Sequence, residues 1–192
     1  MTRTARTSAW LMACTALLTI ACSAQNDQAD QSGPWSANWL LDPPVTGWPT
    51  NGGNLFNQRY SPLAQINPDN VERLGGVWRT HLRGSGIGAQ YSGSAQPLID
   101  DGVIYVVTGA NDVFALDFET GTILWEYQAG LDPDITSVCC GWTSRGVAIN
   151  DELVFVGRLD ARLVALDRDT GDVVWDIQAE AWERDSVGRF GI

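Results

Sequence analysis

The chain has 192 residues, of which 44% are hydrophobic and 18% are charged, a composition typical of a globular protein rather than a disordered one. Its formal net charge is −11. Because an acidic surface repels phosphate backbones, this charge argues against a protein that binds nucleic acid.

Residues 1–24 predict an export signal, because two arginines precede an apolar stretch that is too short for a stable membrane span. The end of this segment is similar to the bacterial lipobox, in which the cysteine, here Cys22, becomes the lipidated first residue. Thr19 departs from that pattern, in which leucine is usual. Lipidation of Cys22 and ordinary cleavage after Ala24 both remain open. We expect a periplasmic protein, anchored to the outer membrane as a lipoprotein if Cys22 carries lipid.

The segments that follow show no long hydrophobic periodicity. Residues 25–34 are polar and suit a flexible tether, whereas residues 35–76 are rich in aromatic residues, proline and asparagine and predict an irregular N-terminal strap. Within the strap we expect a short helix from Asn67 to Leu74, with Pro68 in its first turn. The stretch Val77–Leu82 then predicts a single strand.

Two features near residue 85 are reminiscent of known sites, but their surroundings do not support them. The glycine-rich stretch Gly84–Gly88 leads into neither a suitable helix nor a Gly-Lys-Ser/Thr end, so it predicts a surface turn rather than a phosphate-binding loop. His81 is the only histidine of the chain. Without a second histidine or metal-spaced cysteines, the sequence supports neither a zinc site nor a Ser-His-Asp centre.

An eleven-residue phrase occurs twice, at residues 115–125 and 165–175, with an offset of 165 − 115 = 50 residues. The copies share Ala, Leu, Asp, Thr, Gly and Trp at corresponding positions. In each copy an Asp-x-x-Thr-Gly corner separates two apolar runs, which predicts a β-hairpin with glycine at a positive φ. The recurring indoles of Trp125 and Trp175 predict packing between repeats rather than catalysis.

A further pair of predicted strands precedes each copy. These pairs are Gln96–Ile99 with Val103–Thr108, and Gly146–Asn150 with Leu153–Gly157. Four short strands in a period of about 50 residues are typical of a β-propeller blade. We therefore predict an all-β chain with two blades, at about residues 96–128 and 145–178. The stretch Val77–Leu82 would complete a closing blade. The alternative is two unrelated hairpins in a β-sandwich.

The stretch from Cys139 to Gly146, Cys-Cys-Gly-Trp-Thr-Ser-Arg-Gly, carries the most chemical information. Adjacent α-carbons lie about 3.8 Å apart, below the usual separation of about 4.4–6.8 Å for bridged cysteines, so a disulfide between Cys139 and Cys140 would form a small strained ring. Strain of this kind points to a functional site. The alternative is a pair of reduced, buried cysteines.

Three motifs together resemble one enzyme family. Residues 47–53 (GWPTNGG) and 57–67 (NQRYSPLAQIN), the Cys-Cys pair followed by Arg-Gly, and the two Trp-ended phrases are similar to pyrroloquinoline quinone (PQQ)-dependent alcohol dehydrogenases, in the same order along the chain. The resemblance covers about residues 45–178. It implies that residues 77–192 form part of an eight-bladed quinoprotein propeller, an incomplete β-propeller of two four-stranded blades.

The resemblance also implies a cofactor site. PQQ would lie in the central well between the Cys139–Cys140 disulfide and a tryptophan, with a calcium or lanthanide ion on the quinone. Arg145 matches the arginine that bonds the quinone oxygens, and Thr143 occupies a neighbouring contact. A cationic donor fixed at that place can stabilise the charge that develops on reduction. The alternative for Arg145 is a salt bridge at the surface or at a blade edge.

The chain departs from the family pattern at several places. Alignment on Pro97 puts Ser94 where the family usually has a glutamate near the cofactor. The metal ligands, the catalytic aspartate and the floor tryptophan belong to later blades and have no counterparts here, and the surroundings of Trp182 do not match the floor motif. Residues 183–192 lose the strand rhythm, which suggests truncation or a frameshift.

Our leading hypothesis is the N-terminal part of an exported PQQ-dependent dehydrogenase. The full enzyme would oxidise an alcohol by hydride transfer to the quinone and pass electrons to a cytochrome, and this chain would be inactive alone. The alternative is a non-catalytic β-propeller lipoprotein that assists outer-membrane assembly. This second hypothesis explains Cys22 but neither the adjacent cysteines nor the strap. A third is an unstable product without function.

Overall fold

The computed structural model describes residues 40–85, 91–135 and 141–179. Predictions that fall on the leader, the tether, Cys22, the pair Cys139 and Cys140, and Trp182 lie outside these residues. Within them the chain forms ten strands and a short 3₁₀ helix, and residues 40–41 are also helical. No helix in this part of the chain is long and apolar enough to cross a membrane.

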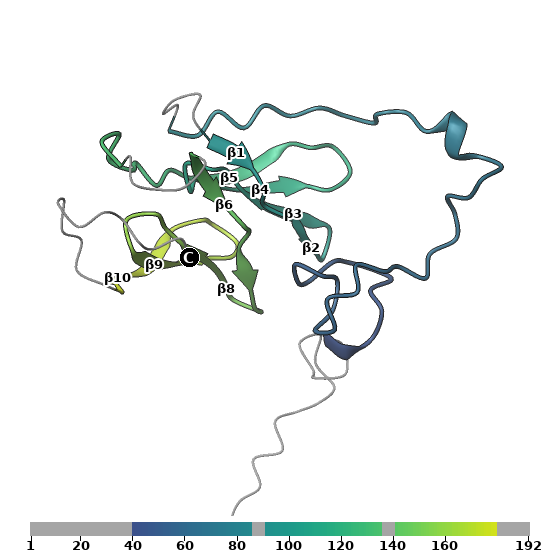
Figure 1. The fold of residues 1–192 in the computed structure, drawn as a ribbon, viewed down its shortest axis with the longest axis horizontal. Helices are drawn as coiled ribbons and strands as arrows, with labels where there is room; N and C mark the ends of the chain where they lie inside the picture. Colours follow the sequence, from purple (N-terminus) through teal and green to yellow (C-terminus); the bar gives the residue numbers. More distant parts are fainter. Residues whose placement is uncertain (1–39, 86–90, 136–140, 180–192) are drawn as a thin grey trace, which may run out of the picture.

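Eight strands form two four-stranded antiparallel sheets, one for each predicted blade. The strands of blade one are β2 (Leu98–Asp100), β3 (Val103–Val107), β4 (Val113–Asp117) and β5 (Ile123–Tyr127). Those of blade two are β7 (Ala148–Ile149), β8 (Leu153–Gly157), β9 (Arg162–Asp167) and β10 (Val173–Gln178). In each blade every strand pairs with the next one along the chain, which confirms the predicted blades (Figure 1).

The Asp-x-x-Thr-Gly corners join the last two strands of each blade, as predicted. The Asp117 carboxylate accepts hydrogen bonds from the backbone N–H and the hydroxyl of Thr120, each at 2.7 Å. The N–H of Thr170 donates to Asp167 in the same way, at 2.9 Å. The glycines of the two corners have φ of +69° and +77°. Because these bonds favour the ionised carboxylates, the pKa of both Asp117 and Asp167 lies below its usual value.

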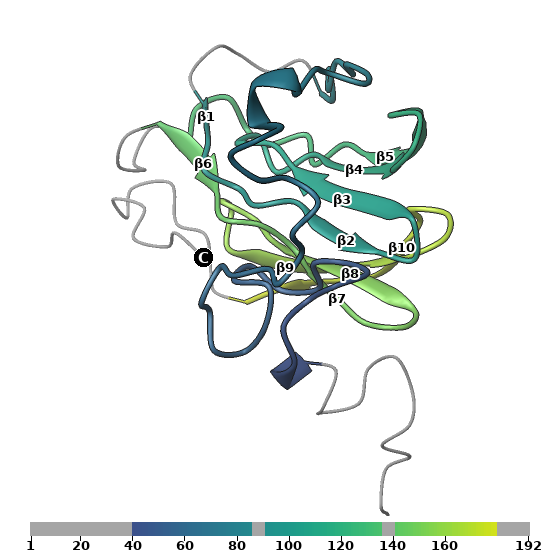
Figure 2. The ribbon, with the colours of Figure 1, turned by 90° about the vertical axis from the view of Figure 1, so that its right-hand side faces the viewer.

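The two sheets pack face to face (Figure 2). Val154 and Val156 of β8 are fully buried while their neighbours in the strand are half-buried, as expected for a β-branched strand between two layers. The core cluster draws on both blades, so neither sheet forms a core of its own. Its buried members are Leu98, Tyr105, Val107, Val113, Ala115, Trp125, Ile149, Val154, Val156, Val164 and Leu166.

Trp125 joins blade one to the corner of blade two. Its indole N–H donates to the carbonyl oxygen of Arg168 at 2.9 Å, and only 9% of the residue is exposed. A Cβ at Gly171 would lie 2.6 Å from the Trp125 ring. The predicted packing of Trp125 between blades is therefore confirmed. Trp175 packs against Phe155 of its own blade with ring centroids 5.9 Å apart, and its packing against a further blade stays a prediction.

Trp78 makes the same kind of contact with the corner of blade one. Its indole N–H donates to the carbonyl oxygen of Phe118 at 3.1 Å, and its ring lies over Gly121. The hydroxyl of Thr80 donates to the Gly121 carbonyl. The predicted strand at Val77–Leu82 is wrong, because these residues have no strand to pair with in the described part of the chain. The side chains of Trp78 and Thr80 attach this segment to the blade.

Arg168 ties the corner of blade two back to blade one through polar contacts. Its guanidinium donates to the hydroxyl of Tyr105 at 2.9 Å and pairs with the Asp100 carboxylate at 2.5 Å. Burial raises the pKa of the Tyr105 phenol, so it stays a neutral hydroxyl that accepts this bond. These contacts fix the relative rotation of the two sheets, which apolar packing alone leaves less specified.

The strap approaches blade one at Trp48. Its backbone pairs with Ile99 of β2 through hydrogen bonds of 2.6 and 3.0 Å. A Cβ at Gly47 would lie 2.6 Å from the Ile99 carbonyl oxygen, so glycine permits this close approach. The irregular strap is thus attached to the free edge of the first strand of the blade (Figure 1).

The helix predicted from Asn67 to Leu74 is wrong in extent. Only the 3₁₀ helix η1 (Val71–Arg73) forms. The side chain of Asn67 accepts the N–H of Asp69 at 3.0 Å, and that of Asn70 accepts the N–H of Asn67 at 2.9 Å. These local bonds offer the backbone an alternative to the regular helical pattern, which explains the shorter element.

Candidate functional site

A parallel pair of short strands, β1 (Tyr91–Gly93) and β6 (Trp142–Ser144), lies at one end of the blades (Figure 2). Neither strand was predicted. Arg145 follows β6 directly, and its carbonyl oxygen accepts the N–H of Gln96 at 3.4 Å. The strands that lead into the two blades therefore bring Arg145 to the beginning of blade one.

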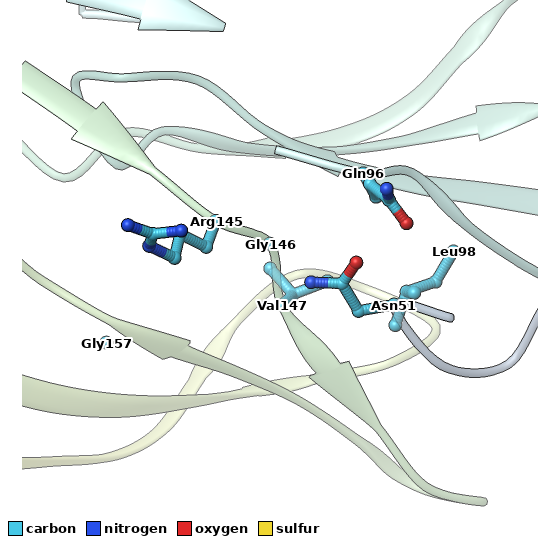
Figure 3. Close-up of a pocket in the computed structure, with 7 residues that line it drawn as sticks. All are labelled: Asn51, Gln96, Leu98, Arg145, Gly146, Val147 and Gly157. Atoms are coloured by element: carbon cyan, nitrogen blue, oxygen red, sulfur yellow. The ribbon is translucent and has the colours of Figure 1, made fainter. Parts of the chain in front are cut away.

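A pocket of about 190 Å³ opens where the strap, blade one and the approach to blade two meet. It is smaller than the roughly 300–1,000 Å³ of complete small-molecule sites. Two blades thus form only part of such a cavity. The lining residues are Asn51, Gln96, Leu98, Arg145, Gly146, Val147 and Gly157 (Figure 3).

The polar groups of this pocket are one guanidinium and two carboxamides, with no carboxylate among the lining side chains. In Figure 3, Asn51 and Gln96 carry their amide groups on one side of Gly146, and Arg145 extends to the other. Arg145 is exposed, so its donors are available to a ligand. In an acidic chain, this lining favours an anionic or carbonyl-bearing ligand over a cation.

Gly146 shapes the surface between these groups. Its φ of +140° lies in a region that residues other than glycine rarely adopt. A ligand held by Arg145 and by either amide must cross this backbone, where no side chain projects. An anionic molecule with carbonyl oxygens suits these donors.

The predicted site residues do not all contribute to the pocket. Arg145 lines it, whereas the half-buried Thr143 lies in β6, opposite Ser92 of β1, outside the lining. Ser94 is exposed and also outside the lining. Gln96 was not predicted as a site residue, although it lies only two positions after Ser94 and begins the first predicted strand. Asn51 was not predicted either, although it belongs to the strap motif at residues 47–53.

Cys139 and Cys140 lie in residues 136–140, outside the described residues, and their predicted disulfide stays a prediction. The two flanks of this stretch are joined, because the indole N–H of Trp142 donates to the Ile135 carbonyl oxygen at 2.8 Å. A second buried cluster supports both flanks. Its members are Ala110, Ala129, Leu131, Ile135, Trp142 and Leu159.

Among residues 40–85, 91–135 and 141–179, no group of three His, Cys, Asp or Glu side chains could hold a metal ion. Calcium and magnesium need several oxygen ligands, which the pocket lining does not offer. The calcium or lanthanide ion, whose ligands the family resemblance assigns to later blades, stays a prediction.

Comparison with known protein families gives one match over most of the chain. The family model described as the β-propeller domain of glucose, ethanol and alcohol dehydrogenases, designated PQQ, matches residues 48–181. This range covers most of the strap, the β1–β6 pair and both blades.

Individual relatives agree with this match. Quinoprotein alcohol dehydrogenase PedH of Pseudomonas putida is 49% identical over 115 residues, which are 60% of this chain and 19% of that protein. The 1-butanol dehydrogenase (cytochrome c) of Thauera butanivorans is 44% identical over 123 residues, 61% of this chain and 16% of that protein. The chain thus spans less than a fifth of the length of these curated relatives.

Solved structures are similar as well. The quinohemoprotein alcohol dehydrogenase of Comamonas testosteroni has a TM-score of 0.69 and 34% identity, covering 78% of this chain and 22% of that one. A europium-containing methanol dehydrogenase has a TM-score of 0.63 and 31% identity, covering 72% of this chain and 24% of that one.

Proposed function

Because the chain belongs to the family of glucose, ethanol and alcohol dehydrogenases with a PQQ-type β-propeller domain, we propose that it supplies one side of a PQQ site in an enzyme that oxidises alcohols. The observation that carries the proposal is the position of Arg145, at the rim of a pocket without carboxylates and next to the side-chain-free surface of Gly146. The predicted alternative of a non-catalytic scaffold gives no role to this arrangement.

PQQ, when bound, supplies a planar, anionic o-quinone that accepts a hydride from the alcohol. The residues of this chain bind and orient it. The Arg145 guanidinium would hold the cofactor through hydrogen bonds to its quinone oxygens and would place positive charge where negative charge develops. Asn51 and Gln96 offer amide donors on the far side of Gly146, and Thr143 lies in β6, two residues before Arg145. Cys139 and Cys140, as a disulfide, would cover one face of the ring.

The proposal also covers the compartment of the protein and its electron acceptor. We propose export to the periplasm on the basis of residues 1–24, with lipidation of Cys22 as the anchor to the outer membrane. A cytochrome is the proposed electron acceptor, in line with the name of the Thauera butanivorans relative. Metabolic labelling with a radioactive fatty acid, compared between the native chain and Cys22→Ser, tests the anchor.

We expect Arg145→Ala to raise the dissociation constant for PQQ about 10- to 100-fold, since hydrogen bonds to charged groups contribute about 1.5–3 kcal/mol. Arg145→Lys keeps the charge but loses the planar pair of donors, so its effect should be smaller. Titration of PQQ into the purified chain, followed by quenching of tryptophan fluorescence, measures both constants. Arg162→Ala is the matched control, because Arg162 is a half-buried arginine that pairs with Asp176 within blade two. Absence of binding to the unaltered chain would refute the proposal.

The 192-residue chain alone is expected not to oxidise alcohols, even with PQQ and calcium. Its two blades do not enclose a ring of the usual four to eight, and the described residues provide no metal site. A steady-state assay with an artificial electron acceptor measures this. Sustained alcohol oxidation by the purified chain would contradict the expectation without affecting the binding proposal.

A further inference from the structure

The turn between β3 and β4 contains two adjacent polar residues that are almost fully buried, Asn111 at 1% and Asp112 at 2% exposure. One carboxylate oxygen of Asp112 accepts the N–H of Ala129 at 2.8 Å. The other accepts the N–H and the hydroxyl of Ser85, at 2.9 and 2.8 Å. Asn111 accepts the N–H of Leu159 from blade two at 2.7 Å. Burying a carboxylate is costly, and three donors offset that cost here.

The repeat itself does not require this pair. At the equivalent positions of blade two, 50 residues later, the chain has Ala161 and Arg162. Both turns keep the same backbone, because Asn111 and Ala161 have φ of +62° and +59°. The Arg162 side chain bonds Asp176 within its own blade. A buried acceptor is thus specific to blade one, although the turn geometry is common to both.

The segments that Asp112 joins both lead to the candidate site. Ser85 is the last described residue before the stretch that enters β1, and Ala129 begins the connection that leads through Cys139 and Cys140 to β6. β1 and β6 then pair with each other, and β6 ends at Arg145. One carboxylate therefore holds the starts of both connections to the strand pair that carries Arg145.

We propose that Asp112 is a positioning residue for the quinone site: its carboxylate fixes the β1–β6 pair and, through it, the place of Arg145 over the pocket. The effect of Asp112 on quinone binding rests on the proposed function, whereas its role in fixing the β1–β6 pair does not. Asp112 itself does not contact the ligand.

The test uses Asp112→Asn, in which an amide N–H₂ replaces one acceptor oxygen and faces donors. We expect hydrogen exchange of peptides covering residues 141–149 to become at least about tenfold faster, and the PQQ dissociation constant to rise about tenfold. Ser85→Ala, which removes one donor, should shift both in the same direction by less, and serves if Asp112→Asn does not fold. Arg162→Gln, at the equivalent turn position, should leave residues 141–149 and PQQ affinity unchanged.

A double variant separates positioning from general stability. If Asp112 acts through Arg145, Asp112→Asn should weaken PQQ binding less than about twofold further in the Arg145→Ala background. Additive effects of Asp112→Asn and Arg145→Ala on the PQQ dissociation constant would overturn the proposal. Equal effects of Asp112→Asn and Arg162→Gln on PQQ binding and hydrogen exchange would do the same. If the unaltered chain binds no PQQ, the proposed function fails. In that case the hydrogen-exchange rate of residues 141–149 still decides whether Asp112 fixes the β1–β6 pair.

Discussion

Replacing Trp125 by alanine is expected to lower the free energy of unfolding by about 3–5 kcal/mol, because removal of a buried tryptophan leaves a cavity between the blades. The indole also donates to the Arg168 carbonyl oxygen and contacts Tyr105 at a centroid distance of 6.1 Å. A loss of this size is a large fraction of the roughly 5–15 kcal/mol stability of ordinary domains. Urea denaturation followed by circular dichroism measures it.

Trp175→Ala is the matched control for this prediction. Trp175 holds the same place in the second copy of the repeat, but it is only half-buried and packs within its own blade. Its removal should therefore cost clearly less than that of Trp125. Trp125→Phe should recover part of the packing but not the hydrogen bond. Equal losses for Trp125→Ala and Trp175→Ala would show that the docking of Trp125 onto blade two contributes little.

The second large effect is expected at Gly171. Alanine there must adopt a φ of +77°, which costs about 1–2 kcal/mol, and its Cβ would lie 2.6 Å from the Trp125 ring. Forcing the indole to move adds an overpacking cost of about 1–3 kcal/mol. We therefore expect Gly171→Ala to destabilise the chain by about 2–5 kcal/mol, measured in the same denaturation experiment.

Gly102→Ala separates the two terms, because Gly102 has a φ of +75° but no atom within 4 Å of the added Cβ. It should show only the backbone cost. In a double-mutant cycle, Gly171→Ala should cost less in the Trp125→Ala background, since the ring that the Cβ meets is gone. Equal losses in the free energy of unfolding for Gly171→Ala and Gly102→Ala would mean that the Trp125 ring adds no steric cost at Gly171.

The repeat could be predicted because residues close together in the sequence determine its turns and strands. The corner residues Asp117 and Thr120, with the glycine that follows, determine each turn through contacts within a few residues, and the strands on either side have a clear apolar pattern. The indole of Trp125 recurs at a fixed place in the period, so its packing between blades followed from sequence as well. These parts of the fold depend little on distant segments.

The rest depends on distant partners. The strands β1 and β6 are three residues long and pair across about 50 residues, which no local pattern reveals. The segment at Val77–Leu82 has a strand-like sequence but pairs with no strand among the described residues, and hydrogen bonds from Trp78 and Thr80 attach it to blade one. Within the candidate site, Arg145 was predicted from a motif, whereas Asn51 and Gln96 enter the pocket through the path of the strap and β2.

A crystal structure of the chain with PQQ bound would show whether Arg145 presents one side of a quinone site. We expect the quinone ring to lie across Gly146, with the Arg145 guanidinium within hydrogen-bond distance of the quinone oxygens. PQQ bound elsewhere on the chain, with no contact to Arg145 or Gly146, would contradict it.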